Sequence, residues 1–182
     1  MSTYQDEIFN YLTKKDNFFS AYEIYQEFPG VKKNLIKQFW LSVKDELTEL
    51  SEKTDWKIEV SENVFETYSS LSIRINDNFY VAYEKLHGQT YHGLWIDNDN
   101  KQLDRIKIND YASNIESLNW MKKYDYWLGC TLTGTNFDSI DTLKKILPDN
   151  RVDFAKELAT LLYELANELN NDILVMSKMI NK

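Results

Sequence analysis

The spacing of the apolar side chains changes after Ser51, and this change constrains the fold more than any other feature of the sequence. Before Ser51, apolar residues recur every three or four positions, which predicts amphipathic helices. After it, short segments alternate apolar and polar residues, which predicts strands. The helical spacing returns after Pro148. Helices, then strands, then helices predict an α+β domain, because an α/β domain would alternate them one by one.

Three helices are expected before Ser51. The first covers residues 4–16, and the second begins at Ser20, where Ser20 and Glu23 form a capping-box pattern. The dipeptide Pro29-Gly30 is expected to end the second helix, so a third, long helix would begin at residue 31. This layout resembles a helix-turn-helix. We therefore expect a helical N-terminal extension at 1–30, followed by the α+β domain at 31–182.

Five segments predict an antiparallel meander sheet. The turns between several of them are short, such as Asn76–Asn78 and His87-Gly88, and short turns join antiparallel neighbours. The expected strands are "WKIEV" (56–60), "LSIRI" (71–75), "FYVAYEKL" (79–86), "TYHGLWID" (90–97) and "YWLGCTLT" (126–133).

Three further helices are expected around the last strand. One lies near 111–123, a short one ends at Pro148, and a long one closes the sequence after a cap at Asp149 or Asn150. The long helix could break at Asn170-Asn171. Its apolar stripe is broad, so this helix could pair with a second copy and give a homodimer.

The composition indicates a cytoplasmic protein of one domain. With 182 residues, the chain can bury a sizeable core without covalent staples. A single cysteine allows no internal disulfide, which fits a reducing compartment. No secretory signal pattern and no run of about 18 apolar residues is found, so no membrane association is expected. The net charge of −8 is spread evenly along the chain, which favours solubility.

Few residues suggest catalysis. In "YWLGCTLT", Cys130 falls on the same side of the expected strand as Leu128 and Leu132, and Trp127 falls on the other side. The thiol of Cys130 is therefore expected to be buried and inert. A base for it would have to be His87 or His92, which we interpret as a turn residue and a half-buried strand residue. These histidines with Asp97 and Asp99 could suggest a metal site, but the spacing fits a solvated loop better. We therefore expect a non-enzymatic protein with no catalytic residue, no metal site and no cofactor.

A short basic stretch offers an alternative function. Lys32, Lys33 and Lys37 would open the third helix, and recognition helices contact DNA with their first turns. The stretch holds no arginine, and only Asn34 and Gln38 could read bases well. A DNA-binding regulator is thus the second hypothesis, and DNA is a possible partner.

The aromatic content suggests a partner surface. The chain holds five tryptophans and twelve tyrosines, and these residue types dominate interaction hot spots. Six of them lie in neighbouring strands or their approaches, where an uncovered sheet face would present them together. The expected partner-binding residues are Tyr80, Tyr91, Trp95, Tyr124, Tyr126 and Trp127.

Three segments, "QFWLSVKDEL", "YDYWLGCTLTGTNFDSI" and "ILPDNRVDFAKELATLL", resemble the C-terminal accessory region of a set of bacterial PD-(D/E)XK nuclease-superfamily proteins. The resemblance covers about residues 33–182 and implies that Trp127, Leu128, Gly129 and Phe137 shape the domain, with Gly129 packing closely beside Trp127. The nuclease motif does not carry over. Asp55-Trp56-Lys57 is the only acid-x-Lys segment worth naming, and it lacks a partner aspartate, so a degenerate metal-dependent nuclease is a third hypothesis.

A chain that resembles the accessory region but lacks the nuclease motif is expected to act by binding another molecule. The resemblance implies a role in the conflict between bacteria and mobile elements. The leading hypothesis is a phage- or prophage-type inhibitor that binds a bacterial defence nuclease, such as a CRISPR effector or its nucleoprotein complex, and blocks its action on nucleic acid.

Overall fold

The computed structural model describes residues 3–97 and 104–179. The described residues fall into two compact units, and the boundary between them lies between Leu35 and Ile36. No helix in these ranges is long and apolar enough to cross a membrane.

The first unit is helical. Helix α1 (Tyr4–Leu12) begins at Thr3, whose hydroxyl accepts a hydrogen bond from the backbone N–H of Asp6, while the Asp6 carboxylate accepts one from the N–H of Thr3 at 2.9 Å. Helix α2 (Lys15–Leu50) follows after a short turn and supplies the rest of this unit. Neither α1 nor the part of α2 before Ile36 contains a buried residue.

The expected turn at Pro29-Gly30 is wrong. Pro29 lies inside α2, and the helix is continuous from Lys15 to Leu50. Ser20 and Glu23 are therefore interior positions rather than a capping box, and the N-terminal helices do not form a helix-turn-helix. A proline removes one backbone N–H and crowds the preceding turn, which costs a helix about 3 kcal/mol. That cost can be offset by the helix-favouring residues on both sides, so proline weakens or bends a helix without always ending it.

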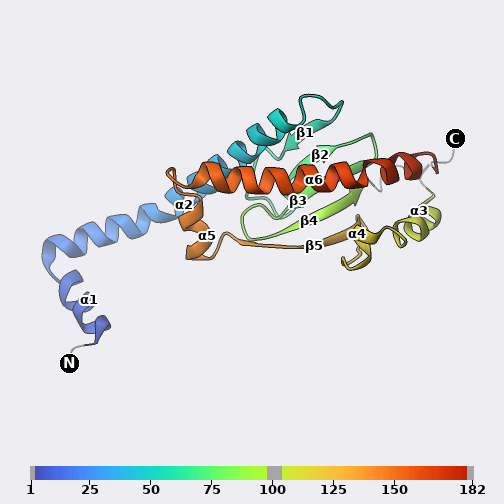
Figure 1. Cartoon of the computed structure of the whole chain (residues 1–182). Coiled ribbons are helices and arrows are strands. Elements are labelled where there is room, and N and C mark those ends of the chain that lie inside the picture. The colour runs from blue at the N-terminus through green and yellow to red at the C-terminus, as the bar shows by residue number, and fades with distance from the viewer. Residues whose placement is uncertain (1–2, 98–103, 180–182) are drawn as a thin grey trace. The chain divides into compact units, whose positions relative to one another are not determined.

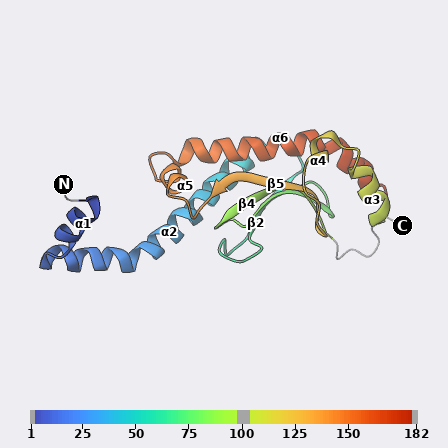
Figure 2. The ribbon, with the colours of Figure 1, turned by 90° about the horizontal axis from the view of Figure 1, so that it is seen from below.

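The second unit contains a five-stranded antiparallel sheet in the order β1-β2-β3-β4-β5, as the alternation predicts. The strands are β1 (Lys57–Val60), β2 (Ser70–Arg74), β3 (Phe79–Glu84), β4 (Gln89–Ile96) and β5 (Trp127–Asn136). The α+β class is confirmed. Helix α6 (Arg151–Ser177) and the last part of α2 cover one face of this sheet (Figures 1 and 2). No described helix covers the other face.

Aromatic side chains hold the covered face to its helices. Phe39 of α2 stacks on Phe154 of α6 with ring centroids 5.1 Å apart, and Trp40 lies 5.5 Å from Tyr83 of β3. Phe137, directly after β5, contacts Phe39 at 5.7 Å and Trp40 at 5.6 Å. The polar ends of two rings are satisfied: the Trp40 indole N–H donates to the carbonyl of Leu86 at 2.6 Å, and the Tyr83 hydroxyl donates to that of Leu158 at 2.9 Å.

The remaining helices differ in part from expectation. The single helix expected near 111–123 is wrong: α3 (Arg105–Ala112) ends where it would begin, and only the short α4 (Glu116–Asn119) lies inside that range. Helix α5 (Ile140–Lys145) ends before Pro148 as predicted. Asn150 is the N-cap residue of α6, which runs unbroken through Asn170-Asn171 because its apolar residues continue to Met176 on the buried side. Most of that stripe is buried in the core, whereas Leu161 is exposed, so pairing of α6 with a second copy stays a prediction.

Candidate functional site

The uncovered face of the sheet has a floor of small side chains. The strand register aligns Ser72, Ala82, Gly93 and Cys130 in one row across β2, β3, β4 and β5. Alternation places every second residue of a strand on the same face, so this row lies opposite the large core residues. Small residues in a row leave a hollow, because the larger neighbours on both sides rise above them.

Aromatic rings rise on both sides of this floor. Tyr80 and Trp95 are directly opposed across β3 and β4, with ring centroids 4.7 Å apart. Trp127 packs with Ala82 and Cys130 in one apolar cluster, against which Tyr91 and Trp95 lie. Offset or tilted ring pairs of this kind hold their geometry in the absence of a ligand.

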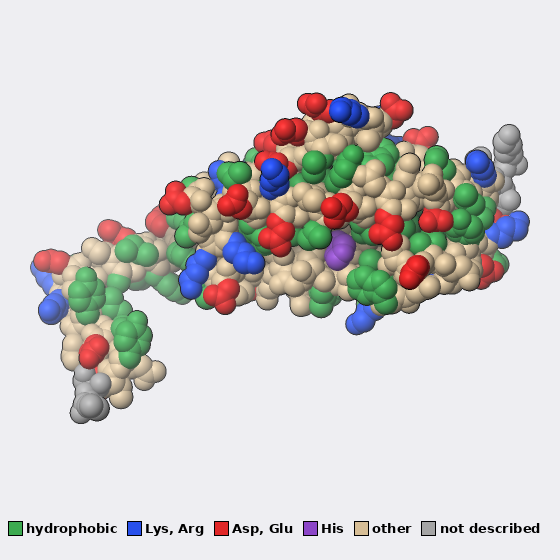
Figure 3. Space-filling view, viewed as in Figure 1, with side chains coloured by type: hydrophobic (Ala, Val, Ile, Leu, Met, Phe, Trp, Pro, Cys, Tyr) green, Lys and Arg blue, Asp and Glu red, His purple; other side chains and the backbone are tan. Residues whose placement is uncertain are grey.

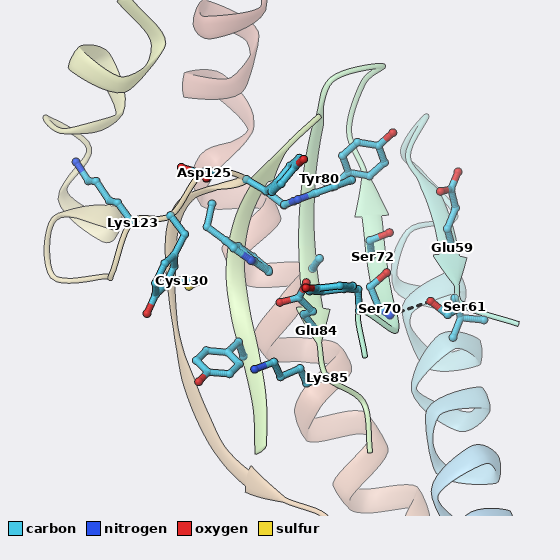
Figure 4. Close-up of a pocket in the computed structure, with 18 residues that line it drawn as sticks. Glu59, Ser61, Ser70, Ser72, Tyr80, Glu84, Lys85, Lys123, Asp125 and Cys130 are labelled. Atoms are coloured by element: carbon cyan, nitrogen blue, oxygen red, sulfur yellow. Dashed lines mark hydrogen bonds between the residues drawn. The ribbon is translucent and has the colours of Figure 1, made fainter. Parts of the chain in front are cut away.

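These elements form a groove of about 1220 Å³ (Figure 4). All six residues predicted to bind a partner line it: Tyr80, Tyr91, Trp95, Tyr124, Tyr126 and Trp127. Tyr124 and Tyr126 come from the loop before β5 and are about half exposed. Tyr68, which precedes β2 and which the sequence interpretation left out, also lines the groove and is 78% exposed.

One carboxylate lies beside these rings. Glu84 is the cross-strand neighbour of Tyr91 and accepts a side-chain hydrogen bond from Trp127. Partial burial raises the pKa of Glu84, and the opposing effects of the Trp127 hydrogen bond and Lys85 are smaller. The groove therefore holds a partly desolvated carboxyl group. A cation or hydrogen-bond donor that enters the groove would stabilise the charged form of this carboxylate.

Two cations already lie over rings of this face. The ammonium of Lys85 lies 5.1 Å from the ring centroid of Tyr91, and the guanidinium of Arg74 lies 5.7 Å from that of Tyr80. Arg74 also pairs with Glu59 at 3.7 Å and with Asp77 at 3.0 Å. Burial raises the pKa of Tyr80, so its hydroxyl stays protonated and able to donate. The groove face thus holds a cation against an aromatic ring at two places, Lys85 at Tyr91 and Arg74 at Tyr80.

Cys130 is 2% exposed, which confirms the prediction of a buried thiol. Burial, with a smaller contribution from Glu84, raises its pKa to about 11. The expected alternation is wrong in one respect: Trp127 and Cys130 lie on the same face. The register shifts between the pairs Leu94–Gly129 and Trp95–Trp127, and this bulge places an extra residue between them.

The two histidines lie away from this thiol. His92 is aligned with Thr131 rather than Cys130, and its ring lies 6.0 Å from Tyr83 on the helix-covered side of the sheet. A Cys130–His92 pair is therefore excluded by the pleat. His87 is in the turn after β3, as expected, and its Nδ1 lies 3.1 Å from the carbonyl oxygen of Val64.

Gly93, which the sequence interpretation did not single out, is needed for the packing of the strands under the groove. A Cβ at Gly93 would collide with the carbonyl oxygen of Gly129 in the next strand. The predicted role of Gly129 needs correction, because a Cβ there would press on Leu118 and Met121, at 3.1 and 3.2 Å, rather than on Trp127. Gly93 thus allows β4 and β5 to approach closely under the groove.

The other residues singled out in the sequence lie outside the groove. Lys32, Lys33 and Lys37 lie inside α2 rather than at a helix start, since α2 continues through Pro29. Asp55 precedes β1, and Lys57 is its first residue. Within 3–97 and 104–179, no group of three or more histidine, cysteine, aspartate or glutamate side chains is arranged to hold a metal ion. Asp99 lies outside the described residues.

No family model, curated protein or solved structure matches the chain. The resemblance to the PD-(D/E)XK accessory region therefore stays a prediction. The groove itself is the feature of the molecule from which a function can be inferred.

Proposed function

We propose that this protein acts by binding a protein partner in the aromatic groove, without catalysis. The observation that carries the proposal is that seven tyrosines and tryptophans, from the uncovered sheet face and the segments next to its strands, line one open groove. Tyrosine and tryptophan bring large contact area at low entropic cost and dominate binding hot spots. A groove of about 1220 Å³ exceeds the usual range of about 300–1,000 Å³ for small-molecule pockets, which favours a polypeptide segment as its occupant.

The charges favour a partner with a basic surface. The groove lining includes the carboxylates of Glu59, Glu84 and Asp125 and only two lysines. The whole chain carries −8, and acidic side chains gather over α6 on the opposite side of the sheet (Figure 3). An arginine or lysine of the partner would meet both aromatic faces and the partly buried Glu84. A nucleic acid backbone would meet repulsion instead.

The proposed partner class is a bacterial defence nuclease, such as a CRISPR effector. Enzymes that hold nucleic acid have basic surfaces, and an acidic protein with an aromatic groove can occupy such a surface in place of the substrate. The support for this class is the charge complementarity and the resemblance to the PD-(D/E)XK accessory region. The raised pKa of Cys130 disfavours one kind of catalysis in the groove, attack by a cysteine thiolate, because the thiol stays protonated and weakly nucleophilic.

The test uses the tagged full chain with a panel of purified effector nucleases, their guides and duplex DNA. We expect one nuclease to be retained stoichiometrically and its DNA cleavage to stop at a one-to-one ratio. The variant Trp95→Ala with Tyr126→Ala should weaken this complex about 30-fold or more, as expected when hot-spot aromatics are truncated. The matched control is Trp120→Ala, because Trp120 is 66% exposed and lies outside the groove.

Each outcome has a defined meaning. Retention of a different protein, lost in the groove variant, would keep the binding proposal and remove the nuclease class. Inhibition at substoichiometric amounts would indicate turnover and contradict a non-enzymatic mode. Equal retention by the groove variant and the Trp120→Ala control would remove the groove as the site.

A further inference from the structure

The helical first unit exposes an unusual amount of apolar surface. Among its described residues, eleven large hydrophobic side chains are exposed: Tyr4, Ile8, Phe9, Tyr11, Phe18, Phe19, Tyr22, Ile24, Tyr25, Phe28 and Val31. Tyr4 is 77% exposed and Tyr25 is 74% exposed, so these rings do not cover one another. Figure 3 shows several such side chains together on this part of the chain. A surface of this kind marks an interaction site.

The exposed area is large enough for a stable interface. Aromatic side chains bury about 150–250 Å² each when fully covered, so eleven half-exposed side chains offer on the order of 1,000 Å² per copy. A standard interface needs about 800 Å² from each partner. Isolated helices are also marginal in water, and most of their stability comes from packing of the apolar side. Helix α1 and the start of α2 therefore require a covering partner.

The sequence of α2 indicates which partner fits. Its apolar seam in this unit is Phe18, Tyr22, Tyr25, Phe28, Val31 and Leu35. The successive spacings are 4, 3, 3, 3 and 4, which read the same from either end. At about 3.6 residues per turn, the six fall on one half of the helix circumference. A seam with this symmetry can face an identical helix that runs in the opposite direction.

The charges permit self-association here and disfavour it elsewhere. Residues 1–35 contain four lysines and five acidic residues, so this unit is nearly neutral. The remaining residues carry a net charge of −7. Two copies would repel over the second unit and not over the first. The nearly neutral helical unit is thus the surface on which like copies can meet.

We propose that two copies of this chain dimerise through an antiparallel pairing of the first part of α2, with α1 of each copy completing the bundle. The two-fold axis passes between Gln26 and Glu27. Phe18 then faces Leu35 of the second copy, Tyr22 faces Val31, and Tyr25 faces Phe28. This interface goes beyond the proposed function, since none of its residues lines the groove, and each assembly would contain two grooves.

The oligomeric state of the full chain tests the dimer. Sedimentation over a range of micromolar concentrations should show a two-fold increase in mass. The double variant Tyr25→Glu with Phe28→Glu should be monomeric, with at least a 100-fold weaker association. Both side chains are exposed, so the folded second unit and its partner binding should persist. The matched control, Ile106→Glu, changes a residue that is 77% exposed on α3 and should stay dimeric.

Cross-linking tests the direction of pairing. A mixture of Tyr22→Cys and Val31→Cys chains should form a mixed disulfide, because these positions face each other. Each variant alone should not, since nine residues of helix separate the equivalent positions by about 13 Å, beyond the reach of a disulfide. Disulfides within each single variant would show parallel pairing and overturn the proposed axis. A monomer at all concentrations would overturn the dimer itself.

Discussion

At the residue scale, the floor of the groove depends on two small residues, Cys130 and Gly93. Cys130 stays a protonated, weakly reactive thiol, because burial and Glu84 raise its pKa. Gly93 matters through the side chain it lacks, since β5 occupies the space where a Cβ would lie. Both residues determine the shape of the groove floor. The reactivity of Cys130 and a substitution at Gly93 can test this separately.

Cys130 should resist alkylation in the folded protein. Its pKa is raised to about 11, whereas an ordinary cysteine has a pKa near about 8.5, so at pH 8 the thiolate fraction falls by at least roughly 100-fold. Mass spectrometry after iodoacetamide treatment should show slow labelling in buffer and fast labelling in concentrated guanidinium. A Leu132→Cys variant is the control, because Leu132 is 44% exposed on the same strand. Equal rates in both solvents would contradict a buried thiol.

Replacing Gly93 by alanine should destabilise the second unit. The new Cβ would collide with the carbonyl oxygen of Gly129, and backbone cannot move as cheaply as a side chain. We expect the free energy of unfolding to fall by about 3 kcal/mol or more. Urea denaturation followed by tryptophan fluorescence measures the change. Gly88→Ala serves as the comparison, since a Cβ at Gly88 meets nothing within 4 Å, and a similar loss there would remove the steric explanation.

At the element scale, α2 has two roles along its length. Its last part buries Ile36, Phe39, Trp40, Val43 and Leu47, while its first part presents aromatic side chains to solvent. The same helical spacing thus serves the core at one end and the proposed dimer surface at the other. Pro29 and Gly30 lie between these parts, and both are unfavourable inside a helix.

Replacing Pro29 by alanine should strengthen α2 around that position. It restores one backbone hydrogen bond and removes a steric clash, together worth about 3 kcal/mol. Amide exchange over residues 25–33 should therefore slow, by up to about 100-fold, while far-UV circular dichroism should show no loss of helix. Pro148→Ala is the control, because Pro148 lies outside the helices and the change should leave helix content unaltered. Unchanged exchange at 25–33 would argue that the chain turns at Pro29 after all.

At the scale of the whole molecule, the proposed binding predicts that charge sets the rate at which partners meet and that the groove sets the lifetime of the complex. A chain with net charge −8 attracts a basic partner over distances longer than any contact. Salt screens that attraction, whereas the aromatic contacts are hydrophobic and depend on salt much less. The two contributions can therefore be separated by kinetics.

The association rate with a partner retained by the groove should fall about tenfold or more between roughly 50 and 500 mM salt, while the dissociation rate changes little. Stopped-flow tryptophan fluorescence measures both rates. The Trp95→Ala variant should dissociate faster with the same salt dependence of association, because it removes a ring and no charge. An association rate that salt does not alter would contradict electrostatic attraction as the source of partner preference.

Much of this molecule was predictable from local pattern. Alternation over 56–97 and 126–133 defines five strands, and short turns define their antiparallel order. Four of the seven aromatic residues of the groove, Tyr80, Tyr91, Trp95 and Trp127, follow from those strands, because residues of consecutive strands become neighbours across the sheet. Local pattern failed where two signals compete: Pro29-Gly30 is a turn signal that the surrounding helix overrides, and 111–123 combines apolar helical spacing with loop residues.

The sequence by itself determined the α+β class, the strands, their meander order and the burial of Cys130, because these depend on side-chain periodicity and on short-range connections. Only the tertiary structure decided which face of the sheet the helices cover, and so which side chains form the core and which form a groove. It also decided the bulge in β5 and the close approach at Gly93. These features arise from packing between segments far apart in sequence, which no local periodicity encodes.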